Sequence, residues 1–271
     1  MMDYQTFKPH PDLSALVKFY WTLEVPFDPN NEKQKIIPDG CIEMTFNLKD
    51  KIKKYISEDE FVVHPDAMIM GQRTKSYFIE PLGDVKSFAI CFYPHGFANF
   101  VNTPLEKLVD KETPIKDLFG KMDGQVLEQK IDNASDTEER IEIIETFLFD
   151  KLNQHSTIEN LVKTTVDALL ITNGSSSIHQ ILKEDLSKRR QLERNFKKQI
   201  GISPKQLGRV LRLQSALQML LDDKESLTTI AYESEYFDQA HFNKDFKEFV
   251  GTTPKEFLGN KNMELSTLFY K

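Results

Sequence analysis

The most constraining feature of this 271-residue sequence is a pattern of helix, tight turn and helix that occurs twice near the C-terminus. Each copy ends in Gly-x-[Ser/Thr]-Pro, at residues 201–204 and 251–254. Glycine ends a helix, Ser or Thr caps the next helix, and proline fits its first turn. One long amphipathic segment, Pro204–Leu221, joins the copies. This part is therefore predicted to hold two helix-turn-helix units joined by a long helix.

The second helix of each unit is predicted from one apolar stripe. Residues 188–200 carry Leu192, Phe196 and Ile200 four apart, and residues 238–250 carry Phe242, Phe246 and Phe249. Short helices at residues 178–182 and Leu227–Glu233 come before them. The tight turns hold Leu186 and Glu235, where a residue that tolerates positive φ is expected. That conformation costs a non-glycine residue about 1–2 kcal/mol.

The N-terminal part shows the two-residue period of strands. In residues 41–48, Ile42, Met44, Phe46 and Leu48 share one face, and Glu43 is expected to point outward. Further strands are predicted at Val17–Val25, 61–63, 67–70, 76–80 and 87–93. Short strands separated by Gly, Pro and Asp predict an antiparallel barrel or sandwich.

Helical periodicity begins near residue 94, with longer helices expected at Thr137–Leu152 and at residues 157–171. Apolar residues of Thr137–Leu152 have a coiled-coil-like spacing, so this helix either pairs with a second subunit or packs on its own domain, the favoured alternative. The predicted fold is α+β and multidomain: a β-rich barrel or sandwich (1–118), a helical linker (119–156), an all-α double helix-turn-helix domain (157–260) and a tail (261–271).

Composition and charge narrow the functional class. Hydrophobic residues make up 39% and charged residues 28%, which is typical of a soluble globular protein. We find no membrane-spanning run, no signal peptide and only two cysteines, which favours the cytoplasm. The net charge of −7 hides an uneven distribution, because residues 175–212 carry ten basic and three acidic residues. Residues 213–260 carry four and nine, so the basic patch lies on the first unit.

Several motifs resemble the AraC/XylS-type DNA-binding domain. In the first unit these are Gln-Leu-Glu-Arg-Asn-Phe at 191–196, Gly-Ile-Ser-Pro-Lys-Gln-Leu at 201–207 and Arg-Val-Leu-Arg-Leu-Gln at 209–214. In the second they are Ile-Ala-Tyr-Glu at 230–233 and Asp-Gln-Ala-His-Phe at 238–242. The resemblance implies a transcription regulator whose two recognition helices enter successive major-groove segments of double-stranded DNA. Residues 20–21, 37–43 and 92–96 resemble a sensor-like domain of unknown ligand.

The resemblance also implies which residues contact DNA. The positions that read bases are Arg190, Glu193 and Arg194 in the first unit and Gln239, Ala240, His241, Asn243 and Lys244 in the second. Those assigned to phosphates are Lys188, Arg189, Lys197 and Lys198. The alternative is a solvated helix face, in which Glu193 pairs with Lys197 at i+4.

Other chemistry has weaker support. A metal site from His64, His95, Glu43 and Cys41 lacks ligand spacing, so no metal or cofactor is expected. Cys41 and Cys91 are expected to be packing residues. We find no phosphate loop or nucleophile motif, so no catalysis is predicted. Expected partners are DNA, a small effector at the N-terminal domain, a second subunit, and RNA polymerase if the chain is an activator. The alternative function is a ligand-binding or enzymatic N-terminal module with auxiliary DNA binding.

Overall fold

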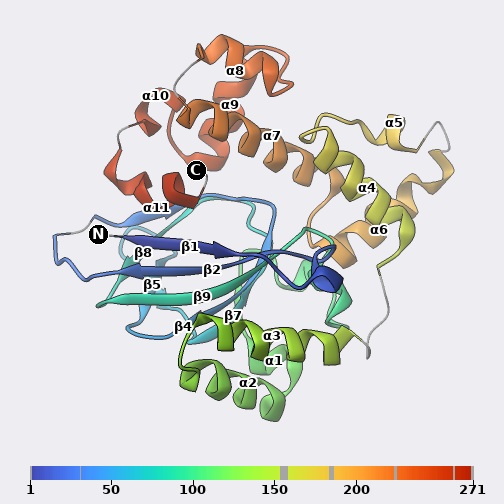
Figure 1. Cartoon of the computed structure of the whole chain (residues 1–271). Coiled ribbons are helices and arrows are strands. Elements are labelled where there is room, and N and C mark those ends of the chain that lie inside the picture. The colour runs from blue at the N-terminus through green and yellow to red at the C-terminus, as the bar shows by residue number, and fades with distance from the viewer. Residues whose placement is uncertain are drawn as a thin grey trace.

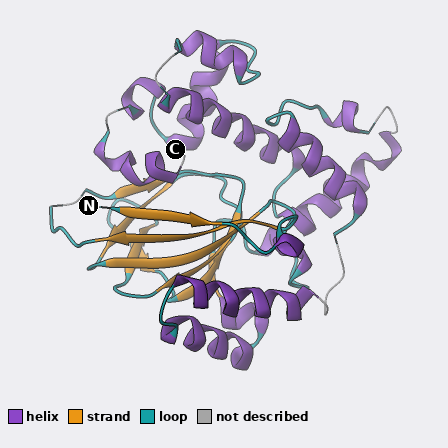
Figure 2. Ribbon diagram, in the orientation of Figure 1, coloured by secondary structure: helices purple, strands orange, loops and turns teal. Residues whose placement is uncertain are grey.

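The computed structural model describes residues 2–30, 32–152, 158–182, 186–222, 225–258 and 260–269. Two predicted positions, Thr157 at a helix start and Asp185 in a turn, lie outside these residues. Figure 1 shows the strands of the N-terminal half between α1–α3 on one side and the C-terminal helices on the other, and Figure 2 shows the strands gathered in one body.

Two antiparallel sheets form the N-terminal half, which confirms the β-rich prediction. One sheet has the order β1-β2-β9-β4-β7-β10 and the other β3-β8-β5-β6. The strands are β1 (Asp3–Phe7), β2 (Val17–Val25), β3 (Gln34–Ile36), β4 (Ile42–Asn47), β5 (Ile52–Tyr55), β6 (Phe61–Val63), β7 (Ala67–Met70), β8 (Tyr77–Pro81), β9 (Val85–Phe92) and β10 (Glu112–Pro114).

The larger sheet packs its outer face on α1 (Ile115–Phe119), α2 (Lys121–Asn133) and α3 (Thr137–Leu152). Met44 and Phe46 of β4 belong to this core together with Ile144 and Leu148 of α3, which are fully buried. The predicted stripe of α3 is therefore packed on its own domain. That burial removes Ile144 and Leu148 from any surface that could pair with a second subunit.

The prediction that Glu43 points outward from β4 is wrong. Glu43 is buried, and so are Thr45 and Asn47 on the same face. All three line a cavity between the two sheets. The alternation of β4 was read correctly, but its polar face points into the protein because the second sheet covers it.

The C-terminal helices follow the predicted order (Figure 1). They are α4 (Asn160–Ile171), α5 (Ile178–Ile181), a 3-10 turn (Leu186–Lys188), α6 (Arg189–Ile200), α7 (Pro204–Leu221), α8 (Leu227–Glu233), α9 (Gln239–Val250), α10 (Pro254–Phe257) and α11 (Glu264–Phe269). No helix within the described ranges is both long and apolar enough to cross a bilayer.

The repeated Gly-x-[Ser/Thr]-Pro motif acts as a helix stop followed by a start. Gly201 and Gly251 have φ of 99° and 80° and end α6 and α9. The Ser203 and Thr253 side chains accept hydrogen bonds from the backbone N–H groups of Gln206 and Glu256, forming capping boxes with those residues. Each motif therefore sets both the end of a recognition helix and the start of the helix after it.

The two tight turns differ from each other. Glu235 adopts a φ of 61°, so the second unit has the predicted left-handed turn in spite of its non-glycine residue. Leu186 instead begins the 3-10 turn before α6. Leu186 therefore does not take the left-handed conformation expected at this position.

Candidate nucleic-acid interface and ligand cavity

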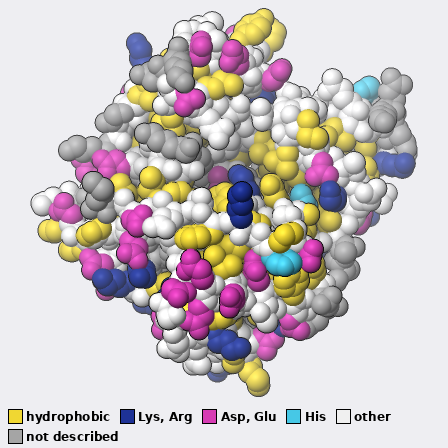
Figure 3. All heavy atoms as spheres, in the orientation of Figure 1, with side chains coloured by type: hydrophobic (Ala, Val, Ile, Leu, Met, Phe, Trp, Pro, Cys, Tyr) yellow, Lys and Arg dark blue, Asp and Glu magenta, His cyan; other side chains and the backbone are white. Residues whose placement is uncertain are grey.

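The first recognition helix, α6, has one buried stripe and a broad basic surface. Leu192, Phe196 and Ile200 are fully buried. Arg190 and Arg194, one turn apart, are both exposed. Lys188, Lys197 and Lys198 are also exposed. Figure 3 shows acidic side chains gathered near α3 in the lower part of the view. The geometry allows α6 to present two arginines to bases between flanking lysines.

Glu193 has a local partner other than the one expected. Its carboxylate forms an ion pair with Arg189, one turn earlier, with Nε and Oε1 3.0 Å apart. The predicted alternative was Lys197, one turn later. Both side chains of the pair are about half exposed, so its contribution to stability is small and the pair can open toward DNA.

The second recognition helix, α9, does not present its five predicted residues equally. Ala240 and Lys244 are exposed, one turn apart. Gln239 accepts a hydrogen bond from Thr228 at 2.9 Å. The His241 ring meets Tyr236 edge-on, and its Nε2 lies 3.9 Å from the Asp245 carboxylate.

Asn243 is half-buried, and its Oδ1 has no hydrogen-bond partner within the described chain. Sequence reasoning missed Phe237, which comes just before the N-cap of α9 and is 87% exposed. Ala240, Lys244 and Phe237 are thus exposed at this unit, whereas Asn243 is less open.

A buried ion pair attaches α9 to the joining helix α7. The Arg209 guanidinium lies 2.9 Å from Asp245 and 2.7 Å from Glu248, and it stacks over the Phe249 ring. These hydrogen bonds raise the pKa of Arg209 and lower that of Glu248. The pair fixes the position of α9 on α7, and sequence reasoning did not find it because 36 residues separate Arg209 from Asp245.

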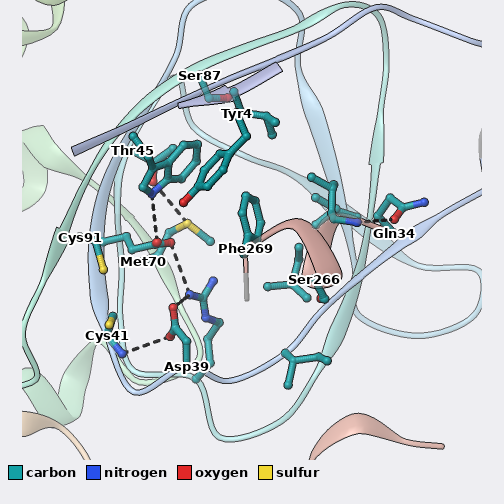
Figure 4. Close-up of a pocket in the computed structure, with 18 of the residues that line it drawn as sticks. Tyr4, Gln34, Asp39, Cys41, Thr45, Met70, Ser87, Cys91, Ser266 and Phe269 are labelled. Atoms are coloured by element: carbon teal, nitrogen blue, oxygen red, sulfur yellow. Dashed lines mark hydrogen bonds and ion pairs between the residues drawn. The ribbon is translucent and has the colours of Figure 1, made fainter. Parts of the chain in front are cut away.

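A cavity of about 600 Å³ lies between the two sheets. Its walls carry aromatic and apolar side chains, among them Tyr4, Trp21 and Met70, and its volume is in the range of sites for small organic molecules. Residues of α11, including Phe269, also line it, so both halves of the chain form the walls (Figure 4).

One wall of the cavity holds a buried charge cluster. The Arg73 guanidinium lies 3.0 Å from Asp39 and 3.4 Å from Glu43. The indole N–H of Trp21 donates to Glu43 at 3.2 Å. Burial raises the pKa of Glu43. Local sequence patterns do not indicate this cluster, because 30 or more residues separate Arg73 from Asp39 and Glu43.

His64 lines the same cavity and is held neutral. Burial, with the charges of Lys54 and Arg73, lowers its pKa from 6.5 to about 4. Both ring nitrogens lack a hydrogen-bond partner within the described residues.

Because folded His64 has a lowered pKa, we expect the free energy of unfolding to fall as the pH falls below 6.5. The variant His64→Leu should not show this contribution. Below pH 6.5 the unfolded chain binds a proton that folded His64 accepts only near pH 4. The free energy of unfolding of the wild type should therefore fall, relative to the variant, by roughly 3 kcal/mol between those pH values. Urea denaturation at pH 7, 5.5 and 4.5 measures it. Parallel pH profiles for the two proteins would contradict the prediction.

Cys41, Glu43 and His64, which were considered for a metal site, line the same cavity, but His95 does not. His95 bonds through Nε2 to the Ala15 carbonyl oxygen at 3.1 Å, away from His64. In the described part of the chain, no three His, Cys, Asp or Glu side chains cluster as ligands would. Cys41 and Cys91 are buried, unbridged thiols in the cavity wall, and a hydrogen bond with Cys41 raises the pKa of Cys91.

β3 and the turn after it connect the cavity to the C-terminal helices. Lys35 of β3 donates to the Val250 carbonyl, at the end of α9, at 3.0 Å. The Pro38 carbonyl accepts a hydrogen bond from Gln214 of α7. Gly40 lies so close to α7 that a Cβ there would sit 3.3 Å from Leu207. Because Asp39 in the same turn binds Arg73, one short segment contacts both the cavity and the joining helix.

The two halves of the chain match two different known families. Residues 187–260 match a family described as a helix-turn-helix domain. Residues 5–114 match a family described as a domain of unknown function, DUF6597. The first match covers both recognition helices, and the second covers the strands that enclose the cavity.

Two curated relatives share the C-terminal part. The HTH-type transcriptional regulator ArgR of Pseudomonas aeruginosa is 38% identical over 68 residues, which are 25% of this chain and 21% of ArgR. An uncharacterized HTH-type transcriptional regulator of Haemophilus influenzae is 34% identical over 80 residues, 30% of this chain and 27% of that protein. The chain thus spans only about a quarter of the length of these relatives.

Solved structures of ToxT from Vibrio cholerae are also similar. One covers 88% of this chain and 97% of ToxT at 13% identity, with a TM-score of 0.49. Another, with an unsaturated fatty acid bound, covers 95% and 94% at 14% identity, with a TM-score of 0.45.

Proposed function

We propose that this chain, whose C-terminal domain is of the AraC type, is a sequence-specific DNA-binding transcription regulator. The observation that carries the proposal is the pair of recognition helices attached to one helix, α7. Its 18 residues span about 27 Å, which brings α6 and α9 near the roughly 34 Å of one DNA turn. Both helices can then enter the major groove on one side of the duplex.

The first unit supplies most of the affinity. Arg190 and Arg194 contact guanine edges, and Glu193 accepts from cytosine once its pair with Arg189 opens. Lys188, Arg189, Lys197 and Lys198 bind phosphates. In the acidic second unit, Ala240 contacts a thymine methyl group, Gln239 an adenine and Lys244 a guanine. His241 and Asn243 contact bases beside them. This unit tunes specificity more than affinity.

The cavity is the site of a small effector that changes how the recognition helices are presented. The support is the turn at Pro38–Gly40, which contacts α7 on one side and Arg73 on the other. A ligand that contacts the Asp39–Arg73 pair can shift the same turn that holds α7. Identical DNA affinity and promoter output with and without a bound ligand would contradict this role.

The proposal places the chain in the cytoplasm, beside its DNA. An activator of this kind also contacts RNA polymerase. Any second copy of the chain binds through a surface other than the buried stripe of α3.

Fluorescence anisotropy of the full chain tests DNA binding. The probe is DNA from upstream of its own gene, with a scrambled duplex as control and a salt series for each. Selective binding should weaken steeply with salt, because the Lys and Arg side chains of α6 release counterions from phosphates. A folded chain that binds neither duplex at low salt, with and without a bound cavity ligand, would overturn the proposal.

A further inference from the structure

The apolar end of the cavity already holds an aromatic ring from the far end of the chain. Phe269 of α11 packs against both Tyr4 and Trp21, with ring centroids 5.3 Å and 5.7 Å away, and these two rings also contact each other at 6.0 Å. Figure 4 shows its ring projecting toward Tyr4. Leu265 and Leu268, on the same face of α11, join the same apolar cluster. The cavity is therefore suited to a flat apolar group, because this chain places one there.

The helix α11 depends on its contacts with β3 and the cavity wall. A helix of six residues does not hold its own conformation in water, so its contacts keep it folded. Leu265 N donates to Gln34 at 3.1 Å, and Ser266 donates to the Lys35 carbonyl. Phe269 remains partly exposed although it packs on two rings. A ligand that binds Tyr4 and Trp21 can therefore replace Phe269 without opening either sheet.

The polar end of the cavity offers hydrogen-bonding atoms that the described chain does not use. These are both ring nitrogens of His64, and in the same wall the Tyr77 hydroxyl interacts with the Arg73 guanidinium. Buried polar atoms of this kind favour a ligand that bonds to them. Burial raises the pKa of Tyr77, which keeps its hydroxyl protonated. Together the three side chains provide N–H and O–H donors and an imidazole acceptor.

The one guanidinium at this end already has two carboxyl partners. Arg73 is paired with Asp39 at 3.0 Å and lies 3.4 Å from Glu43. An anionic group would meet these two carboxyl groups, and a cationic group would meet the guanidinium. Since burial increases the cost of either mismatch, a neutral group is favoured.

We propose that the cavity binds a neutral molecule with a flat apolar body and a polar edge that donates and accepts hydrogen bonds, and that its body replaces the Phe269 ring. This inference rests on the proposed effector role of the cavity. Displacing Phe269 frees α11 from β3, the strand whose Lys35 also holds the end of α9. Ligand binding thereby reaches the second recognition helix.

Calorimetry on the full chain tests the proposal with three probes of one shape. Biphenyl-4-carboxamide is neutral, biphenyl-4-carboxylate is anionic and biphenyl-4-ylmethylammonium is cationic. The amide should bind at least ten-fold more tightly than either ion. The variant Phe269→Ala should bind the amide about ten-fold more tightly than the wild type, because the competing ring is gone. Leu258→Ala, an exposed leucine outside the cavity, is the matched control and should bind like the wild type.

Trp21, the single tryptophan, reports on the same site and on folding. Its emission should shift with the amide and should show that Phe269→Ala is folded. Tighter binding of an ion, equal or weaker amide binding by Phe269→Ala, or no binding by the folded chain would each overturn the proposal. The calorimetry contains no DNA, so a failure of DNA binding is observed separately and leaves this result unchanged.

Discussion

Replacing Arg190 and Arg194 together with alanine is expected to abolish sequence-selective DNA binding while the chain stays folded. Both side chains are exposed on α6, and neither belongs to a buried cluster. Each bidentate contact with guanine is worth about 1–3 kcal/mol, so the pair should cost roughly 2–6 kcal/mol of binding free energy. Anisotropy with the specific and scrambled duplexes measures the loss, and circular dichroism checks the fold.

The matched control removes the same charge from another place. Lys121→Ala with Lys130→Ala takes two exposed cations from α2, far along the chain from the recognition helices. This variant should keep its preference for the specific duplex. If the two double variants lose selectivity equally, the effect is one of total charge, and the assignment of Arg190 and Arg194 to base reading is wrong.

Replacing Arg209 with alanine should destabilise the second helix-turn-helix unit strongly. The change leaves the Asp245 carboxylate, which is 5% exposed, without its cation. Removing one partner of a buried ion pair typically costs about 3–5 kcal/mol, and here the packing of the guanidinium on Phe249 is lost as well. The free energy of unfolding in urea measures the effect.

Glu248→Ala is the companion variant. Glu248 is bound to the same guanidinium, but its side chain is 54% exposed. Its loss should cost no more than about 1 kcal/mol, as for other exposed ion pairs. Equal losses for Arg209→Ala and Glu248→Ala would show that burial of Asp245 does not control the stability of this unit.

The helices of the DNA-binding half were predictable because local signals define them. α7 and α8 have the predicted bounds, since a Ser cap begins each of them and apolar residues recur with the helical period. α11 was assigned to a tail. Its apolar face is only three residues long and has meaning only beside Tyr4 and Trp21, which lie more than 240 positions earlier.

The β-rich half was harder to predict from local patterns. Strands β2, β6 and β7 were predicted with their bounds, but β1, β3, β5 and β10 were not predicted. β3 has three residues and β5 carries two adjacent lysines, so neither has a clear alternation. Alternation in β4 identified two faces and could not show that a second sheet covers the polar one. The cavity and its Arg73 cluster were therefore beyond the reach of local patterns.

Each half of the chain packs one apolar side chain into a core of the other half. This limits which recombined genes would encode a well-packed protein. Ile37, from the N-terminal half, is 1% exposed within the core of the second helix-turn-helix unit. Leu265, from the C-terminal half, is 5% exposed within the apolar cluster of the cavity. A crossover that joined this DNA-binding half to another sensor would leave a hole where Ile37 packs and would leave Leu265 without its apolar cluster. Descendants of this chain should therefore inherit both halves together.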